Sequence, residues 1–195
     1  MKKKTIISAI LGVVTMFCAC FGFAGCTDDE AKDKIPEGTN GKALVAYFSA
    51  TNTTKGVAEK IAVATGGALY RITPVEPYTS ADLNYGNSSS RTSKEQNDSK
   101  ARPAISGSVE NMDEYDIVFL GYPIWWGESP KIIYTFLESY DFSGKTIIPF
   151  CTSASSPMSN SGSNLHSSAP NAIWKAGCRV SSTAHIDALV NEIKR

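Results

Sequence analysis

The sequence has 195 residues, a length typical of one domain with additional segments, and its 19 basic and 19 acidic side chains balance formally. Three of the basic residues are Lys2, Lys3 and Lys4, so the chain after Cys26 carries 16 basic and 19 acidic residues, a net charge of −3. A mildly acidic domain has no electrostatic reason to bind nucleic acid, and we expect no nucleic-acid partner.

The first 25 residues have the pattern of an export signal. A lysine-rich start is followed by an almost wholly apolar run at residues 6–23, and two small residues precede Cys26. The run FAGC at residues 23–26 resembles the lipobox of bacterial lipoproteins. The resemblance implies that Cys26 becomes the first mature residue, carries a lipid and holds the protein on the outer side of the cytoplasmic membrane. A plain cleavable signal or an uncleaved anchor helix is the alternative.

Three parts of the chain follow from this pattern. Residues 1–25 are the signal, residues 26–41 are the lipidated cysteine with a flexible charged linker, and residues 42–195 are the folded domain. Of the five cysteines, only Cys151 and Cys178 belong to the domain. In an oxidising compartment they can form a disulfide, and the alternative is that both are small core residues.

The domain begins with a strand, a polar loop and a helix. Ala43–Phe48 is a short apolar run typical of a buried strand, and apolar residues recur at helical spacing over residues 57–64. The loop between them offers hydroxyl and amide donors next to the unpaired N–H groups of a helix N-terminus, which favour an anion. It lacks the Gly-Lys-Ser/Thr ending of a nucleoside-triphosphate loop, so we interpret it as a cradle for a lone terminal phosphate. The alternative is an ordinary connection in which Thr53 or Thr54 caps the helix.

The remaining pattern alternates strands with helices. The expected strands are residues 68–73, 115–121, 145–151 and 172–175, and the expected helices follow Pro130, lie near residues 165–168 and span residues 185–193. Residues 76–111 form a long polar insertion, with a polar surface helix expected at residues 90–101. A connection of this length is usually functional or mobile. Tyr78, Tyr85 and Arg91 can reach a ligand from it, although surface packing is the favoured role.

This alternation predicts an α/β sandwich around a parallel sheet. In such sheets ligands bind beyond the carboxyl ends of the strands. The three unusual loops, at residues 49–54, 122–128 and 152–164, all follow predicted strands, so we expect them to meet at one edge of the sheet. That convergence is the main argument for a binding site.

The second loop contains two adjacent tryptophans, Trp125 and Trp126. Neighbouring side chains of an extended segment point in opposite directions, so one indole can pack inward while the other lines a pocket for a planar ligand. The alternative is a pair of aromatic plugs at the sheet edge. Together with a phosphate loop, the pair describes a ligand with a phosphate at one end and a flat ring at the other, and FMN fits that description.

A resemblance to the flavodoxin family, in a branch with a Pro-x-Trp-Trp loop, rests on three segments: ALVAYFSATNTTKGVAEKIA, DIVFLGYPIWWGESPKIIYTFLE and GKTIIPFCTSASS. It extends over residues 42–195. It implies a flavodoxin-like three-layer sandwich, with a five-stranded parallel sheet in the order 2-1-3-4-5, and FMN as cofactor. By position, the implied FMN-binding residues are Ser49, Thr51, Asn52, Thr53 and Thr54 for the phosphate, Pro123, Ile124, Trp125, Trp126 and Gly127 for the ring, and Thr152, Ser153, Ala154 and Ser155 on the other side of the ring. Related third loops are often rich in glycine, whereas this one has none directly after Thr152 and Ser153.

The chemistry of the family belongs to the flavin, while the protein supplies binding, orientation and electrostatics. We therefore expect no catalytic side chain, and the two histidines, which lie apart, predict no metal site. The resulting hypothesis is an FMN-binding electron-transfer protein with a redox partner protein, favoured over a self-contained enzyme. The alternatives are an FMN-dependent NAD(P)H or quinone oxidoreductase, whose insertion builds a substrate pocket, and a binding lipoprotein that has lost FMN. Fold alone does not decide among them.

Overall fold

The unbroken apolar runs of the sequence form the centre of the sheet in the computed structural model, which describes residues 41–194. The central strands are β1 (Ala43–Tyr47), β5 (Ile117–Pro123) and β6 (Thr146–Thr152), flanked by β2 (Ala68–Arg71), β7 (Ile173–Trp174) and β8 (Cys178–Arg179). The order is β2-β1-β5-β6-β7, and every pair in this sheet is parallel. In chain order this is 2-1-3-4-5, so the predicted topology is confirmed.

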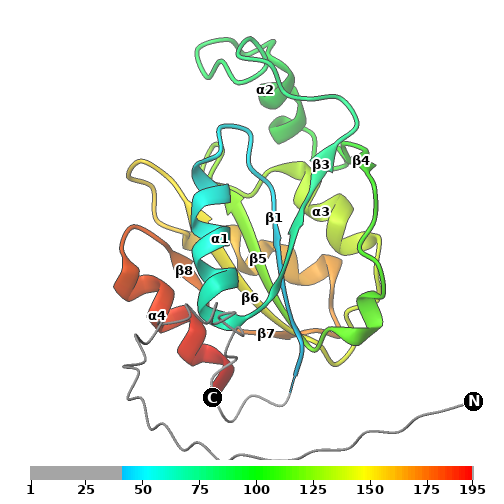
Figure 1. The fold of residues 1–195 in the computed structure, drawn as a ribbon. Helices are drawn as coiled ribbons and strands as arrows, with labels where there is room; N and C mark the ends of the chain where they lie inside the picture. Colours follow the sequence, from blue (N-terminus) through cyan, green and yellow to red (C-terminus); the bar gives the residue numbers. More distant parts are fainter. Residues whose placement is uncertain (1–40, 195) are drawn as a thin grey trace, which may run out of the picture. The chain divides into compact units, whose positions relative to one another are not determined.

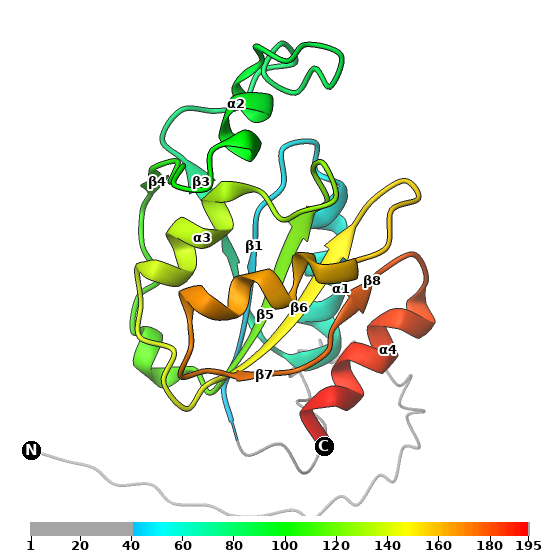
Figure 2. The same ribbon diagram turned by 180° about the vertical axis from the view of Figure 1, so that it is seen from behind.

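Helices cover both faces of the sheet (Figures 1 and 2). α1 (Thr53–Thr65) and α4 (Thr183–Asn191) lie on one face, and α3 (Lys131–Glu138) and the 3-10 helix η3 (Ser163–Ser168) lie on the other. Side chains of the strands alternate between the two layers. On β1, Leu44 packs in the core beneath α3, while Val45 packs in the core beneath α1 and α4. Burial on both faces explains why the strands read as continuous apolar runs.

The fifth strand position is divided into two short pieces. β7 pairs with the start of β6, and β8 pairs with its end, at Phe150↔Cys178 and Cys151↔Arg179. Between them Gly177 has a φ of 64°, and a Cβ atom there would lie 2.0 Å from the carbonyl oxygen of Pro149. The sequence predicted β7 but not β8, because a two-residue strand after a glycine has no recognisable period.

The two cysteines of the domain lie on opposite faces of the sheet. Cys151 belongs to the core beneath α3, whereas Cys178 packs against the core beneath α1 and α4, and both thiols are free. A disulfide between them would require the strands to be rebuilt. Cys151 is therefore a small core residue, whereas Cys178 is half-buried against the other core. Burial raises the pKa of the Cys151 thiol to about 12, so this thiol stays protonated at neutral pH.

The insertion after β2 has its own small sheet. β3 (Thr73–Pro74) pairs antiparallel with β4 (Ile105–Ser106), and the segment between them carries α2 (Arg91–Asn97), a shorter form of the helix predicted at residues 90–101. Figures 1 and 2 show α2 beyond the carboxyl ends of the central strands. Short 3-10 turns complete the chain at η1 (Met112–Glu114), η2 (Ser159–Ser161) and η4 (Glu192–Lys194).

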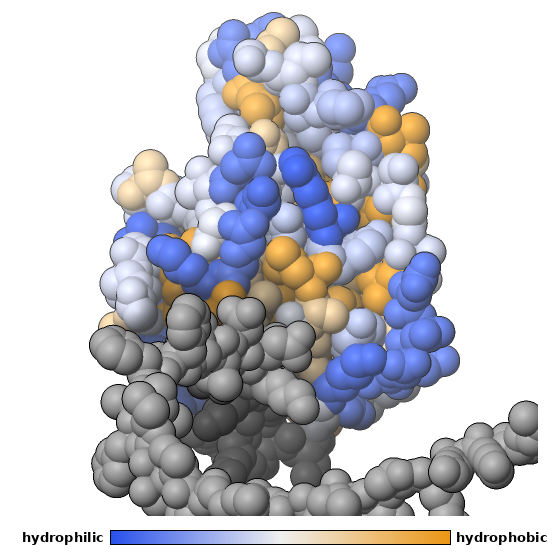
Figure 3. All heavy atoms as spheres, viewed as in Figure 1, coloured by the Kyte–Doolittle hydropathy of each residue, from blue (hydrophilic) through white to orange (hydrophobic). Residues whose placement is uncertain are grey.

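The surface of the α1 face is mixed in character. Figure 3 shows hydrophilic and apolar residues interspersed on the face that carries α1, and Val63 on this helix is 75% exposed. Within residues 41–194, none of the helices combines the length and the apolarity that crossing a membrane requires. The predicted signal, the lipidation of Cys26 and nearly all of the predicted linker lie outside these residues.

Candidate functional site

The three loops that follow β1, β5 and β6 meet at the carboxyl edge of the sheet, as the sequence predicted, and enclose a cavity of about 370 Å³. This volume lies in the range of small-molecule sites, which is about 300–1,000 Å³. The lining comes from all three loops and from the insertion: Ser49, Ala50, Thr51, Thr53, Thr54, Leu83, Tyr85, Pro123, Ile124, Trp125, Thr152, Ser153 and Ala154.

At one end of the cavity the first loop leads into the N-terminus of α1. Asn52 is the N-cap residue, with a φ of 64°, and its side chain forms no capping hydrogen bond. The first turn of α1 contains no acidic residue. The alternative in which Thr53 or Thr54 caps the helix is not realised, because both residues lie within the helix. The N–H groups of the first turn are therefore available to an anion, which the positive end of the helix dipole also favours.

Ser49 adds a second feature that points to an anion. Its side chain is only 3% exposed, yet its hydroxyl oxygen has no hydrogen-bond partner, and the residue lines the cavity. A buried polar group without a partner costs about 1–3 kcal/mol. A phosphate oxygen in the cavity would accept a hydrogen bond from this hydroxyl and remove that cost.

A buried hydrogen bond joins the first turn of α1 to the end of β6. The hydroxyl oxygens of Thr54 and Thr152 lie 2.8 Å apart, and both residues line the cavity. The two threonines are separated by 98 positions in the chain, so the bond ties the start of α1 to the end of β6. The bond thus connects two walls of the cavity.

The second loop places its two tryptophans differently. Trp125 is 5% exposed and lines the cavity, and its ring packs edge-on against Phe48 and Tyr78 at centroid distances of 5.4 and 5.2 Å. Trp126 is 41% exposed and packs against Tyr85 at a centroid distance of 4.4 Å. The two indoles thus point in different directions, and the inner one faces the cavity.

The chain reverses direction at these tryptophans in a tight turn. The backbone N–H groups of Trp125 and Glu128 each donate to the carbonyl of the other residue, at 2.9 Å. The two central residues have φ values of 50° at Trp126 and 78° at Gly127, which is the type I′ arrangement. Glycine adopts such values readily, whereas tryptophan does so at a cost in conformational energy.

Most of the residues expected at the site line the cavity, and four do not. Asn52 caps α1, Trp126 and Gly127 form the outer side of the turn, and Ser155 lies on the exposed part of the third loop. Sequence reasoning missed the cavity contacts of Leu83 and Ala50. Surface packing was the favoured prediction for Tyr85. In the structure this tyrosine packs against Trp126 at the surface and also lines the cavity.

The cavity lining combines polar hydrogen-bond donors with apolar surface. Ser49, the threonines and the start of α1 offer hydroxyl and N–H donors, while Ile124, Trp125 and Leu83 offer apolar and aromatic surface. No carboxylate, lysine, arginine or histidine of the described chain lines the cavity. Residues 41–194 also contain no cluster of histidine, cysteine, aspartate or glutamate side chains able to hold a metal ion. The site suits a ligand that has an anionic group and a flat apolar part.

Comparisons with known proteins agree with this geometry. A family model described as Flavodoxin matches residues 42–195. A proposed flavoprotein from Bacteroides eggerthii DSM 20697 is 49% identical, with a TM-score of 0.76, over 80% of this chain and 99% of that chain. A proposed flavoprotein from Bacteroides uniformis ATCC 8492 is 46% identical, with a TM-score of 0.72 and the same coverage.

A more distant structure shares the fold. A flavoprotein from Lactobacillus acidophilus NCFM, solved in complex with FMN, is 23% identical, with a TM-score of 0.60, over 76% of this chain and 98% of that chain. A search of curated proteins found no match. The family model spans the whole described domain, and the 49% identical relative is covered almost completely. This chain belongs to the flavodoxin family.

Proposed function

We propose that this protein binds FMN in the cavity at the carboxyl edge of the sheet and transfers electrons to or from a redox partner protein. The observation that carries the proposal is the buried, unpaired hydroxyl of Ser49, in the loop that leads to α1, in the same cavity as Trp125. This arrangement fits a phosphate at one end and a flat ring at the other. Membership of the flavodoxin family and the FMN complex of the Lactobacillus acidophilus protein, which shares the fold, support the choice of ligand.

Each loop would have a separate task toward FMN. Ser49, Thr51 and the N–H groups at the start of α1 would hold the phosphate by hydrogen bonds. The ring would lie against Trp125, between the Pro-x-Trp-Trp loop of this branch and the third loop. When bound, the flavin supplies one- and two-electron transfer, and the chain orients it and limits its contact with water.

Replacing Ser49 by alanine tests this assignment. We expect FMN to bind roughly 10- to 100-fold more weakly, because a hydrogen bond to a charged group contributes about 1.5–3 kcal/mol. Affinity for riboflavin, which lacks the phosphate, should not change, and stability should not fall, since the removed hydroxyl is buried and unpaired. The measurement is flavin absorbance per protein after desalting, followed by a binding titration.

The exposed Ser155 offers a matched control, since Ser155→Ala removes a hydroxyl that does not line the cavity. Equal losses of FMN affinity in the two variants would contradict the phosphate assignment. If the folded wild-type protein retains no flavin at all, the proposed function fails and a binding lipoprotein without FMN takes its place.

The role of electron carrier is preferred to that of a self-contained oxidoreductase. No lysine, arginine or histidine of the described chain lines the cavity, so the lining offers no cationic side chain to the phosphates of NADPH. NADPH added without air to the FMN-loaded protein should leave the flavin oxidised, while dithionite reduces it. Rapid reduction by NADPH alone would favour the oxidoreductase, with Leu83 and Tyr85 as part of a substrate pocket.

The proposal includes a location outside the cytoplasm. The basic start, the apolar run and Cys26 support a lipid anchor that holds the domain on the outer side of the cytoplasmic membrane. Incorporation of labelled fatty acid into the wild-type chain, and its loss in Cys26→Ser, is the expected result. Labelling that persists in Cys26→Ser would refute the anchor without affecting the FMN site.

A further inference from the structure

One side chain of the insertion bonds directly to the loop that carries the tryptophans. The amide nitrogen of Gln96, in α2, donates to the backbone carbonyl of Trp125 at 2.8 Å and to that of Ser129 at 3.3 Å. Both neighbours are acceptors, so only the NH₂ side of the amide can face them. The amide oxygen of Gln96 is buried without a partner, which shows that the orientation is imposed by the two carbonyls.

This contact fixes the turn at its first residue. The carbonyl of Trp125 accepts from Gln96 and also from the N–H of Glu128, at 2.9 Å, so both of its lone pairs are used. The next residue, Trp126, has a φ of 50°. A non-glycine residue in such a conformation persists only where its surroundings hold it. Gln96 supplies part of that support from outside the loop.

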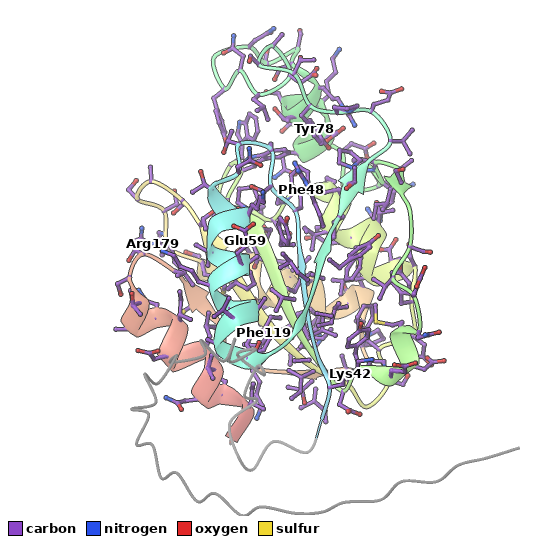
Figure 4. All side chains as sticks on the ribbon, in the orientation of Figure 1. Lys42, Phe48, Glu59, Tyr78, Phe119 and Arg179 are labelled. Carbon is purple, nitrogen blue, oxygen red and sulfur yellow. The ribbon has the colours of Figure 1, made fainter. Side chains whose placement is uncertain are left out.

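The same insertion holds the ring of Trp125 through Tyr78. The hydroxyl of Tyr78 donates to Glu95 at 2.7 Å, and Arg91, whose guanidinium lies 4.0 Å from the centroid of the Tyr78 ring, forms an ion pair with Glu95 at 2.7 Å. The side chains of this pair are only 23% and 14% exposed. Tyr78 also packs against Phe48, and both residues are labelled in Figure 4. Phe48 in turn packs against the indole of Trp125. Burial and the carboxylate of Glu95 raise the pKa of Tyr78, so its hydroxyl remains a donor.

We propose that Gln96 is a positioning residue for Trp125, and that the insertion acts through it as a clamp on the aromatic wall of the cavity. The insertion would then set the geometry of the FMN ring site. The effect on flavin rests on the proposed function, whereas the positioning of Trp125 does not.

The test replaces Gln96 by glutamate, which keeps the shape of the side chain and turns an oxygen toward the two carbonyls. Asn97→Asp is the matched control, because it makes the same chemical change at the adjacent, exposed position of α2. Gln96→Ala removes the donor without adding charge. In the full chain we expect both Gln96 variants to change the near-ultraviolet circular dichroism of the tryptophans. We also expect FMN to bind about two- to tenfold more weakly, the effect of losing one hydrogen bond, and its midpoint potential to shift.

Asn97→Asp should match the wild type in all three measurements. The proposal is overturned if Gln96→Ala also matches the wild type, or if the two Gln96 variants change stability alone and leave the spectrum and the potential unaltered. Should the wild type retain no FMN, the proposed function fails by itself, and the tryptophan spectrum of the ligand-free protein still decides whether Gln96 positions Trp125. If Gln96→Glu does not fold, the alanine variant supplies the same comparison.

Discussion

Replacing Trp125 by alanine is expected to remove most of the FMN that the protein retains after desalting. The indole forms the aromatic wall of the cavity, and stacking of a base on an aromatic side chain contributes about 1–3 kcal/mol, or up to roughly a hundredfold in affinity. The same change leaves a hole between Phe48 and Tyr78, so we expect the free energy of unfolding to fall by about 3–5 kcal/mol. Binding titration and urea unfolding measure the two effects separately.

Trp126→Ala provides the comparison at the neighbouring position. Trp126 is 41% exposed and contacts Tyr85 rather than the cavity, so its loss should change stability within about 0.5 kcal/mol, the usual range for surface residues. FMN affinity should fall much less than in Trp125→Ala. If Trp126→Ala loses as much FMN as Trp125→Ala, the outer indole rather than the inner one contacts the ring.

Gly121→Ala is expected to destabilise the centre of the sheet. Gly121 on β5 pairs with Phe150 on β6, and an added Cβ atom would lie 2.2 Å from the tip of that fully buried ring. The ring is enclosed on all sides and must shift for the methyl group to fit. Overpacking of this kind costs about 1–3 kcal/mol. A lower urea midpoint with an unchanged slope would be the sign of this loss.

Two further variants test whether overpacking causes the loss of stability in Gly121→Ala. Gly56→Ala, on α1, meets no atom within 4 Å and should be stabilising by about 0.5–1 kcal/mol, because alanine favours helices. Phe150→Leu in the Gly121→Ala background should recover part of the lost stability, since the two sites share one volume. A Gly121→Ala protein that unfolds at the wild-type urea concentration would show that the sheet accommodates the methyl group.

The central sheet was predictable because its information is local. Three short runs are largely apolar without alternation, a pattern typical of strands covered on both faces: Ala43–Tyr47, Ile117–Pro123 and Thr146–Thr152. The β3–β4 pair and β8 were not predictable in this way. β3, β4 and β8 contain two residues each, and one residue of β3 is a proline. They form strands only because each pairs with a distant part of the chain.

The cavity was predicted as a meeting of three loops, and that prediction depended on topology alone. Which side chains face inward depended on details that a pattern does not contain. Leu83 and Tyr85 reach the lining because the insertion folds back over the sheet edge, and Trp126 turns outward because its φ is positive. The bond from Gln96 to Trp125 spans 29 positions between a polar helix and a loop, so no local signal announces it.

The antiparallel pairing of β3 with β4 brings the two ends of the insertion together at Thr73↔Ser106. A segment whose ends already touch can change its length at small cost, since doubling a flexible loop costs only about 0.6 kcal/mol. The central sheet does not include β3 or β4, so its strand pairing would be unaffected by such changes. This part of the chain is therefore an exchangeable module. Related proteins can differ here in the rim of a shared site, and a different insertion can be grafted at the same two strands.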